Sequence, residues 1–245
     1  HKTYVLAGDG CLMEGISHEA MSLAGHLKLK NLVMLFDNNS ISIDGPTSLA
    51  VSDNFKKRFE SYGWDYILID GHNEKEIFKA LKKVQKAKKP TVISCKTKIG
   101  YGSPNKSGKS SSHGSPLGLD EIKLVRNALN WNYKPFKIPN KFLKEWKKIG
   151  KKGQKLENNW NKIYKKKKEL INKLQKNNFT KILKTEKLCA IKELNSLATR
   201  KSSELTLNKL TSIRNNLIGG SADLAGSNNT KTKHHKIIKP GDFNS

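Results

Sequence analysis

The sequence predicts an α/β fold in which a parallel sheet is flanked by helices. Short apolar segments typical of buried strands alternate along the chain with longer segments whose apolar residues recur at helical spacing. Glycine, asparagine and aspartate stand directly after the first strands, where chain turns are expected. At 245 residues the chain is long enough to bury a sizeable core. Strands that alternate with helices in this way are typical of parallel sheets.

The first β–α–β unit is predicted from residues near the start of the chain. Tyr4–Ala7 is a short apolar run of buried-strand type, and Leu32–Phe36 is a second one. Between them, Gly15–Leu29 has helical spacing. Its predicted inner face is Ile16, Ala20, Leu23, Ala24 and Leu27. The carboxyl ends of parallel strands in such a unit form a ligand crevice.

Polar residues follow both of these strands. Asp9 leaves the first strand and Asn39 leaves the second, so a carboxylate and an amide oxygen are expected to meet at one sheet edge. Such hard oxygen ligands suit Mg²⁺ or Ca²⁺, which often bind through few protein ligands plus phosphates. Gly8 and Gly10 would let the backbone approach a diphosphate. Taken alone, Gly8–Gly10 is most often just a turn.

Two more helix–strand pairs are expected to complete the sheet. Ser52–Asp53 is an N-cap signal for a short helix through Phe59, and Trp64–Ile69 is a strand. Asn73 caps a clearer helix, and Thr91–Cys95 is the next buried strand. The predicted inner face of the capped helix is Ile77, Ala80, Leu81 and Val84.

The remaining chain is predicted to be a loop followed mainly by helices. Lys96–Gly118 is a long loop, of a length that is usually functional or disordered. Asp120–Leu129 is an amphipathic helix. Lys141–Lys176 is a helical linker whose aromatic residues are expected to pack under lysine stems. Leu183–Leu217 is a helical run, and Ile218–Leu224 is a strand that breaks into a loop.

The composition is strongly basic. The formal net charge is +26, and Arg58, Arg126, Arg200 and Arg214 are the only arginines, so the excess is almost all lysine. This could indicate a nucleic-acid-binding module built on a degenerate α/β core, which is the alternative from a different functional class. No zinc-finger, helix-turn-helix or RNP-type pattern accompanies the charge. We therefore interpret most of the lysines as solvated surface and expect no nucleic-acid partner.

The cysteines and the apolar runs bear on the compartment. Cys11, Cys95 and Cys189 are odd in number and widely spaced, which suits a reducing cytosol. No apolar run approaches the length of a membrane span, and His1–Thr3 leads straight into a strand rather than a signal peptide. A cytoplasmic protein with no membrane partner is expected.

Several motifs together resemble one family. Residues 11–37 separate Gly10 from Asn38, and this spacing resembles the thiamin-diphosphate signature. The flanking segments resemble transketolase in the family's order, namely GDGCLMEGISHE at 8–19, SLAGHLKL at 22–29, ISIDG at 41–45, IGYGSPNK at 99–106, HGSPLG at 113–118, TRKSS at 199–203 and GGSADL at 219–224. The resemblance implies the thiamin-diphosphate-binding fold.

The resemblance also implies a domain organisation. Residues 1–180 match the C-terminal part of the diphosphate-binding domain with a helical linker, and residues 181–245 match the start of a pyrimidine-binding α/β domain. The first residues match a mid-domain strand, so the chain is expected to be an internal fragment of a longer enzyme. We expect it to be inactive alone, because the family's activating glutamate lies beyond Ser245.

Metal and cofactor residues are carried over from the family by position. The resemblance implies that Asp9, Asn39 and the backbone carbonyl of Ile41 hold Mg²⁺ (or Ca²⁺). It implies that thiamin diphosphate is bound by Gly10, Asn39, His113 and Asp223. Without its flanking match, His113 would be interpreted as an ordinary surface-loop histidine.

Substrate residues are carried over in the same way. His113 is the implied catalytic residue and contacts the sugar, while Arg200 and Ser227 bind its phosphate. Arginine's planar fork fits phosphate well, although Arg200 could also be an ordinary exposed helix arginine. Gly226 stands where the family often has proline, which weakens the assignment of Ser227.

The implied activity is reversible transfer of a two-carbon ketol unit from a ketose phosphate to an aldose phosphate, as in the pentose phosphate pathway. The implied partners are sugar phosphates and a second copy, since the family's active site lies at a homodimer interface. Dihydroxyacetone synthase and 1-deoxyxylulose-5-phosphate synthase are alternatives with related chemistry. Residues 22–29 and 99–106 favour transketolase over the second of these.

Overall fold

The computed structural model describes residues 1–175, 184, 197–214 and 216–243. The chain forms two compact units, each described here by itself. The first comprises His1–Asn132 together with a short segment that begins at Ile237, and the second comprises Tyr133–Lys236. The predicted domain boundary at residue 180 lies outside the described residues and stays a prediction.

The first unit is built on a four-stranded parallel sheet, as predicted. Its strands lie in the order β1-β2-β6-β5, with all three neighbouring pairs parallel. Val33 in β2 pairs with Tyr4 on one side and with Thr91 on the other. The bounds are β1 Thr3–Gly8, β2 Leu32–Asn38, β5 Asp65–Asp70 and β6 Thr91–Lys96. A small antiparallel pair, β3 (Ile41–Ser42) and β4 (Gly45–Pro46), follows β2.

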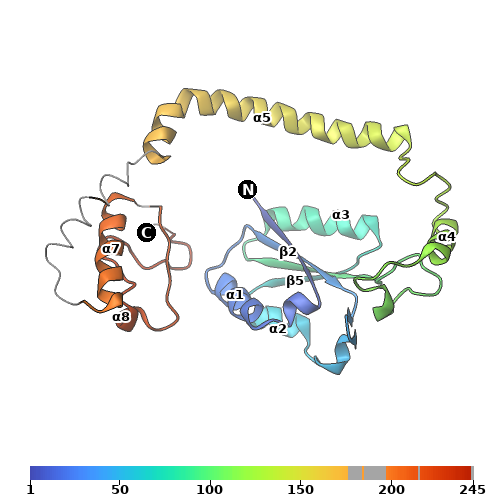
Figure 1. The fold of residues 1–245 in the computed structure, drawn as a ribbon, viewed down its shortest axis with the longest axis horizontal. Helices are drawn as coiled ribbons and strands as arrows, with labels where there is room; N and C mark the ends of the chain where they lie inside the picture. Colours follow the sequence, from blue (N-terminus) through green and yellow to red (C-terminus); the bar gives the residue numbers. More distant parts are fainter. Residues whose placement is uncertain (176–183, 185–196, 215, 244–245) are drawn as a thin grey trace. The chain divides into compact units, whose positions relative to one another are not determined.

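Helices cover both faces of this sheet (Figure 1). Helices α1 (Gly15–His26) and α2 (Phe55–Ser61) lie on one face and α3 (Glu74–Lys83) lies on the other. Successive side chains of β2 point to opposite faces, so Met34 packs in the α1/α2 core and Val33 in the α3 core. The sheet is therefore a central layer, with its carboxyl edge left open.

Helix α3 matches its prediction closely. The side chain of Asn73 accepts hydrogen bonds from the main-chain N–H groups of Lys75 and Glu76, as an N-cap should. Ala80 and Val84 are fully buried against the sheet, with the other predicted inner-face residues packed beside them. The amphipathic pattern was sufficient to predict the buried face of this helix, because the residues that pack against the sheet all lie on one side of it.

The predicted cap of α2 is wrong by one residue. Asn54, rather than Ser52 or Asp53, accepts from the N–H of Lys57 at 3.0 Å. Asp53 instead pairs with Arg58. Both side chains are chemically able to cap, and the ion pair decides which one does.

The predicted burial of β1 and of α1 is also wrong in part. Leu6 of β1 is 81% exposed, because β1 is an edge strand of the described sheet. On α1, Ile16 and Leu23 are exposed, whereas Met21, Ala24 and Gly25 are buried. A Cβ atom on Gly25 would lie 1.7 Å from the carbonyl oxygen of Tyr62. The small residue lets the helix approach there, and this rotates the larger apolar side chains outward.

The long loop after β6 is present as predicted, with only a 3-10 turn at Ser110–Ser112. It leads into α4, Leu119–Ala128, which confirms the predicted amphipathic helix. Glu121 of α4 is 8% exposed and accepts hydrogen bonds from Ser103 and from Asn105 of the loop. The loop is therefore held to a helix at its middle.

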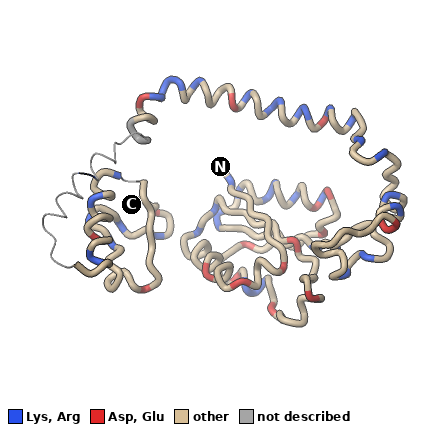
Figure 2. Tube along the Cα trace, in the orientation of Figure 1, with Lys and Arg blue, Asp and Glu red and all other residues tan. Residues whose placement is uncertain are grey.

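The second unit begins with the predicted long helix α5, Asn140–Gln175. Lysine residues are distributed along most of its length (Figure 2). Phe142, Trp146 and Trp160 are exposed, with Trp146 76% exposed, so the predicted packing role is wrong for them as buried anchors within this unit. Lys141 does lie over the ring of Phe142, as predicted for the lysine stems. Trp160 stacks on Tyr164, one turn away on the same helix. Apolar residues that recur at helical spacing predict an amphipathic helix. They do not predict which other segment, if any, packs against its apolar face.

The rest of the second unit contains helices α7 (Thr199–Ile213) and α8 (Ala225–Asn228). Much of the predicted helical run Leu183–Leu217 lies outside the described residues. The predicted strand at Ile218–Leu224 is wrong, because these residues form a bend without strand pairing. A strand needs a hydrogen-bonded neighbour, and the described part of this unit offers none. No helix among the described residues is long and apolar enough to span a membrane.

Candidate functional site

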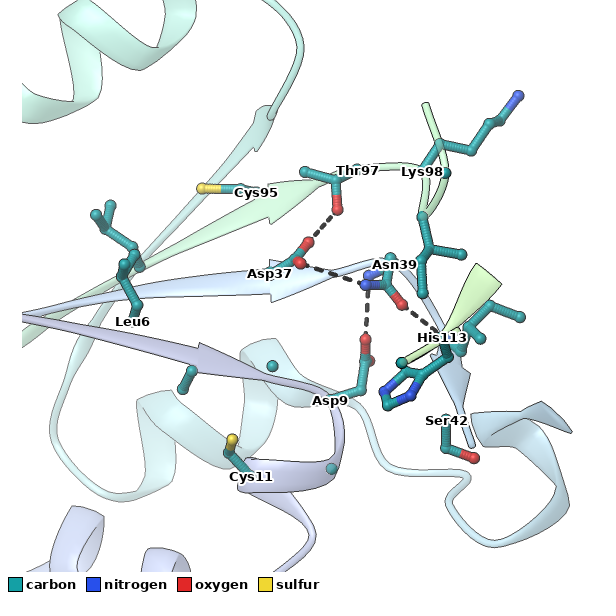
Figure 3. A pocket seen from close by; sticks show the side chains of 18 of the residues that line it. Leu6, Asp9, Cys11, Asp37, Asn39, Ser42, Cys95, Thr97, Lys98 and His113 are labelled. Atoms are coloured by element: carbon teal, nitrogen blue, oxygen red, sulfur yellow. Dashed lines mark hydrogen bonds between the residues drawn. The ribbon is translucent and has the colours of Figure 1, made fainter. Parts of the chain in front are cut away.

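A pocket of ≈ 1150 Å³ opens at the carboxyl edge of the sheet in the first unit. It is lined by residues from the ends of β1 and β2, by β3, and by the loops after β5 and β6. Figure 3 shows Asp9, Asn39 and His113 converging on it from separate segments. This is the position predicted for a ligand crevice in a parallel sheet.

Asp9 is the most buried polar group of the pocket. The residue is only 4% exposed, and its Oδ2 accepts from the main-chain N–H groups of Asn39 and Ser40, both at 3.1 Å. Its Oδ1 is buried without a hydrogen-bond partner. Burial raises the pKa of Asp9, and the two main-chain hydrogen bonds oppose that rise. A buried carboxylate oxygen that lacks a donor is suited to coordinate a cation.

The side chain of Asn39 is oriented from two sides. Its Oδ1 accepts from the N–H of Ile41 at 3.0 Å, and its Nδ2 donates to Asp37 Oδ2 at 3.3 Å. The other oxygen of Asp37 accepts from the hydroxyl of Thr97, which follows β6. These contacts join β2 to β6 and hold the amide beside Asp9 (Figure 3).

His113 reaches the same pocket from the long loop. Figure 3 places its ring beside Asp9 and Ser42, and its Nδ1 is buried without a hydrogen-bond partner. Gly10 also lines the pocket, and a Cβ atom there would meet nothing within 4 Å. Open space thus lies beside the Gly10 backbone, where a ligand could approach closely. The structure brings together five predicted residues, namely Asp9, Gly10, Asn39, Ile41 and His113.

The charges of the pocket favour a cation. Asp9, Asp37 and Asp44 line it, and Lys98 is the lining lysine. An anionic ligand would be repelled by these carboxylates unless a metal ion lay between them. Among the described residues, no group of three or more His, Cys, Asp or Glu side chains forms a metal site. A divalent ion would therefore take one carboxylate, an amide and a carbonyl here, and the ligand's own oxygens would complete its coordination.

The three other predicted residues belong to the second unit. Arg200 is in the first turn of α7, Ser227 is in α8, and Asp223 lies between these helices with a positive φ of 60°. All three are exposed within their unit. Their assigned roles stay predictions.

Sequence reasoning missed several residues that shape the pocket. Asp37 and Thr97 orient Asn39, while His72 and Lys98 form another part of the wall. Asp37 is the second-last residue of β2, and the others lie within two residues of the end of β5 or β6. Applying the carboxyl-edge rule to all four strands, instead of to the first two, would have found them.

Comparisons with known proteins identify the family of the chain. The family model described as "Transketolase, thiamine diphosphate binding domain" matches residues 1–187. A transketolase of Buchnera aphidicola is 44% identical over 259 residues, covering 98% of this chain and 38% of that protein. A transketolase of Rhodobacter capsulatus is 42% identical over 251 residues. The match covers 99% of this chain and 37% of the Rhodobacter protein.

Solved structures are similar over nearly the whole chain. The transketolase of Campylobacter jejuni has a TM-score of 0.82 at 38% identity, covering 94% of this chain and 36% of that one. A Pichia stipitis transketolase in complex with sedoheptulose-7-phosphate has a TM-score of 0.82 at 35% identity, covering 98% and 37%. The chain thus spans well under half the length of these relatives. Because the family model matches most of the chain and the fold agrees with that of a solved transketolase at 38% identity, this chain belongs to the transketolase family.

Proposed function

We propose that this chain forms the diphosphate-binding part of a transketolase. The activity is reversible transfer of a two-carbon ketol unit between a ketose phosphate and an aldose phosphate. When bound, thiamin diphosphate supplies the nucleophilic carbon for this transfer. The chain's own residues bind and orient the cofactor and the sugar. The observation that carries the proposal is the unpartnered, buried Oδ1 of Asp9 at the open edge of the sheet.

The residues present fit a divalent ion, either Mg²⁺ or Ca²⁺. Asp9 would bind through Oδ1, because Oδ2 is already held by two main-chain N–H groups. Asn39 Oδ1 and the carbonyl of Ile41 would supply the other protein ligands. The ion would neutralise the diphosphate, and the room beside Gly10 would let its backbone approach that group.

Residues in different parts of the chain are proposed to contact the sugar. His113, with its unpartnered Nδ1 in the pocket, would contact the substrate and the cofactor diphosphate. Arg200 and Ser227 would bind the sugar phosphate, so that distant binding energy orients the reacting carbon. Asp223 would lie near the cofactor. Sugar phosphates as substrates are consistent with the Pichia stipitis complex.

The assembly and setting are part of the same proposal. A homodimer with the active site at its interface, in the cytoplasm and in the pentose phosphate pathway, would complete the function. Cys11 and Cys95 are free thiols, which suits a reducing compartment, and Cys189 lies outside the described residues. The relatives reported above are transketolases, so neither related synthase nor a nucleic-acid module is favoured.

Magnesium-dependent binding of thiamin diphosphate to the 245-residue chain tests the proposal. Isothermal titration with excess Mg²⁺ is expected to give saturable binding that EDTA abolishes and added Mg²⁺ restores. The Asp9→Ala variant is expected to lose this metal dependence. Asp65→Ala is the matched control, since Asp65 begins β5 at the opposite edge of the sheet.

The outcomes separate the cofactor from the metal site. No saturable binding by the unmodified chain under any metal condition would contradict the proposed function. Binding by Asp9→Ala with unchanged metal dependence would contradict the metal assignment and leave the cofactor assignment in place.

A further inference from the structure

His72 contacts the start of the loop that forms one wall of the pocket. It follows β5 and precedes α3. Its Nε2 accepts the main-chain N–H of Lys98 at 3.0 Å, and its ring stacks on Tyr101 with centroids 4.0 Å apart and planes 16° apart. One side chain therefore holds this loop through both a directional hydrogen bond and a flat apolar contact.

The backbone of His72 is itself well anchored. Its N–H donates to Asp70 Oδ1 at 2.9 Å, and the N–H of Asp70 donates to Glu76 Oε2 at 2.8 Å. Asn73, the N-cap of α3, donates through Nδ2 to Glu76 Oε1 at 3.2 Å. The imidazole thus projects from a turn that is hydrogen-bonded to the first turn of a helix. A ring fixed in this way can hold the loop that it contacts in one position.

The segment held by His72 continues to His113. The carbonyl of Ile99 accepts from the N–H of Gly108 at 2.8 Å, which closes the loop on itself. Gly100, at a φ of 64°, lies so close to Ser112 that a Cβ atom would be 3.0 Å from its Oγ. Ser112 directly precedes His113. A displacement at Lys98 would therefore be passed through Gly100 to the residue beside His113.

We infer that His72 is a positioning residue that sets the pocket wall from Lys98 to His113. Because Nε2 accepts a main-chain N–H, the ring must be neutral with its proton on Nδ1. The hydrogen bond and the loop it holds belong to the chain without any ligand. The consequence for cofactor binding rests on the proposed function.

Nuclear magnetic resonance of the ligand-free chain tests the hydrogen bond directly. A scalar coupling between the ¹⁵N nuclei of Lys98 and His72 Nε2 is expected across the N–H···N bond. Its absence from the unmodified chain would overturn the inference. In His72→Phe, which keeps a flat ring but lacks the acceptor, amide exchange at Lys98 and Gly108 should accelerate at least about fivefold.

His72→Gln separates the acceptor from a general loss of structure. Its amide oxygen reaches about as far as Nε2, so it should restore most of the slow exchange that His72→Phe loses. Equal acceleration in both variants, or in neither, would overturn the assignment of the acceptor. His26→Phe is the matched control, because His26 is an exposed histidine at the end of α1. It should leave exchange in the loop unchanged.

Thiamin diphosphate titration with excess Mg²⁺ completes the experiment. The dissociation constant is expected to rise about fivefold or more in His72→Phe and to stay near the unmodified value in His72→Gln and His26→Phe. Equal affinity of His72→Phe and the unmodified chain would overturn the inference. If the unmodified chain itself does not bind, the proposed function fails, and the exchange measurements alone decide the role of His72.

Discussion

The main-chain N–H of Asn39 donates to Asp9 Oδ2 at 3.1 Å, although the two residues lie 30 positions apart in the chain. This hydrogen bond ties the end of β1 to the residues that follow β2 and occupies one carboxylate oxygen, while Oδ1 stays unpartnered. Hydrogen bonds from Asn39 to Asp37 and from Thr97 to Asp37 extend the connection to β6. The candidate metal ligands are therefore oriented by three neighbouring strands.

Loss of the Thr97 hydroxyl should weaken metal binding. Thr97→Val removes the hydroxyl that donates to Asp37. The Asp37 carboxylate is then less fixed and orients Asn39 less well, so the affinity for Mn²⁺ is expected to fall about tenfold. Titration followed by electron paramagnetic resonance of free Mn²⁺ measures this. Thr97→Ser keeps the hydroxyl and should bind nearly as the unmodified chain does. Equal affinity of the valine and serine variants would show that the Thr97 hydroxyl does not influence metal binding through Asp37.

Stability should depend on pH through Glu121. Hydrogen bonds from the Ser103 hydroxyl and from the main-chain and side-chain N–H groups of Asn105 lower the pKa of Glu121 from 4.5 to about 2. Because the folded state favours the ionised form, the stabilisation is complete above the ordinary pKa. It is lost as the pH falls from 4.5 toward about 2.

Urea unfolding at a series of pH values checks this against Glu121→Gln, which cannot ionise. The unmodified chain should be the more stable of the two near neutral pH, and the difference should shrink steadily below pH 4.5. A difference that is the same at pH 7 and pH 3 would contradict the assignment.

Gly25 should tolerate no side chain. In Gly25→Ala the new Cβ would lie 1.7 Å from the carbonyl oxygen of Tyr62, so α1 would have to move away from the core. We expect the free energy of unfolding to fall by about 3 kcal/mol, measured by urea denaturation. Gly15→Ala in the same helix meets nothing within 4 Å and should change stability little. Similar losses in both variants would contradict the role of the contact with Tyr62, because helix propensity alone favours alanine over glycine.

The lysines of α5 should not support tight nucleic-acid binding. Replacing Lys165–Lys168 with serine is expected to leave magnesium-dependent cofactor binding unchanged, because these residues lie in the other unit. Fluorescence anisotropy with single-stranded RNA should show only weak binding that vanishes by about 0.15 M salt. Tight RNA binding with a steep salt dependence, lost on this replacement, would revive the nucleic-acid-binding alternative.

The sequence was sufficient for the order of the four sheet strands and of the helices between them in the first unit, and for the part of the site closest to the strands. Buried strands and the Asn73 cap depend on local periodicity and on one side chain's own hydrogen bonds, which a linear pattern records. Asp9 and Asn39 could be placed together because parallel strands end at a common edge. His113 and Ile41 entered through family motifs. For His113 the reason is that nothing in a glycine- and serine-rich loop predicts where it folds.

Only the tertiary structure decided which face of each element is covered and what orients the site. Leu23 and Ile16 look like core residues by spacing, yet the approach of Gly25 to Tyr62 turns the helix and exposes them. His72 and Lys98 are far apart in the chain, and their contact depends on β5 and β6 being neighbours. Such contacts are set by packing between distant segments, which local sequence patterns do not contain.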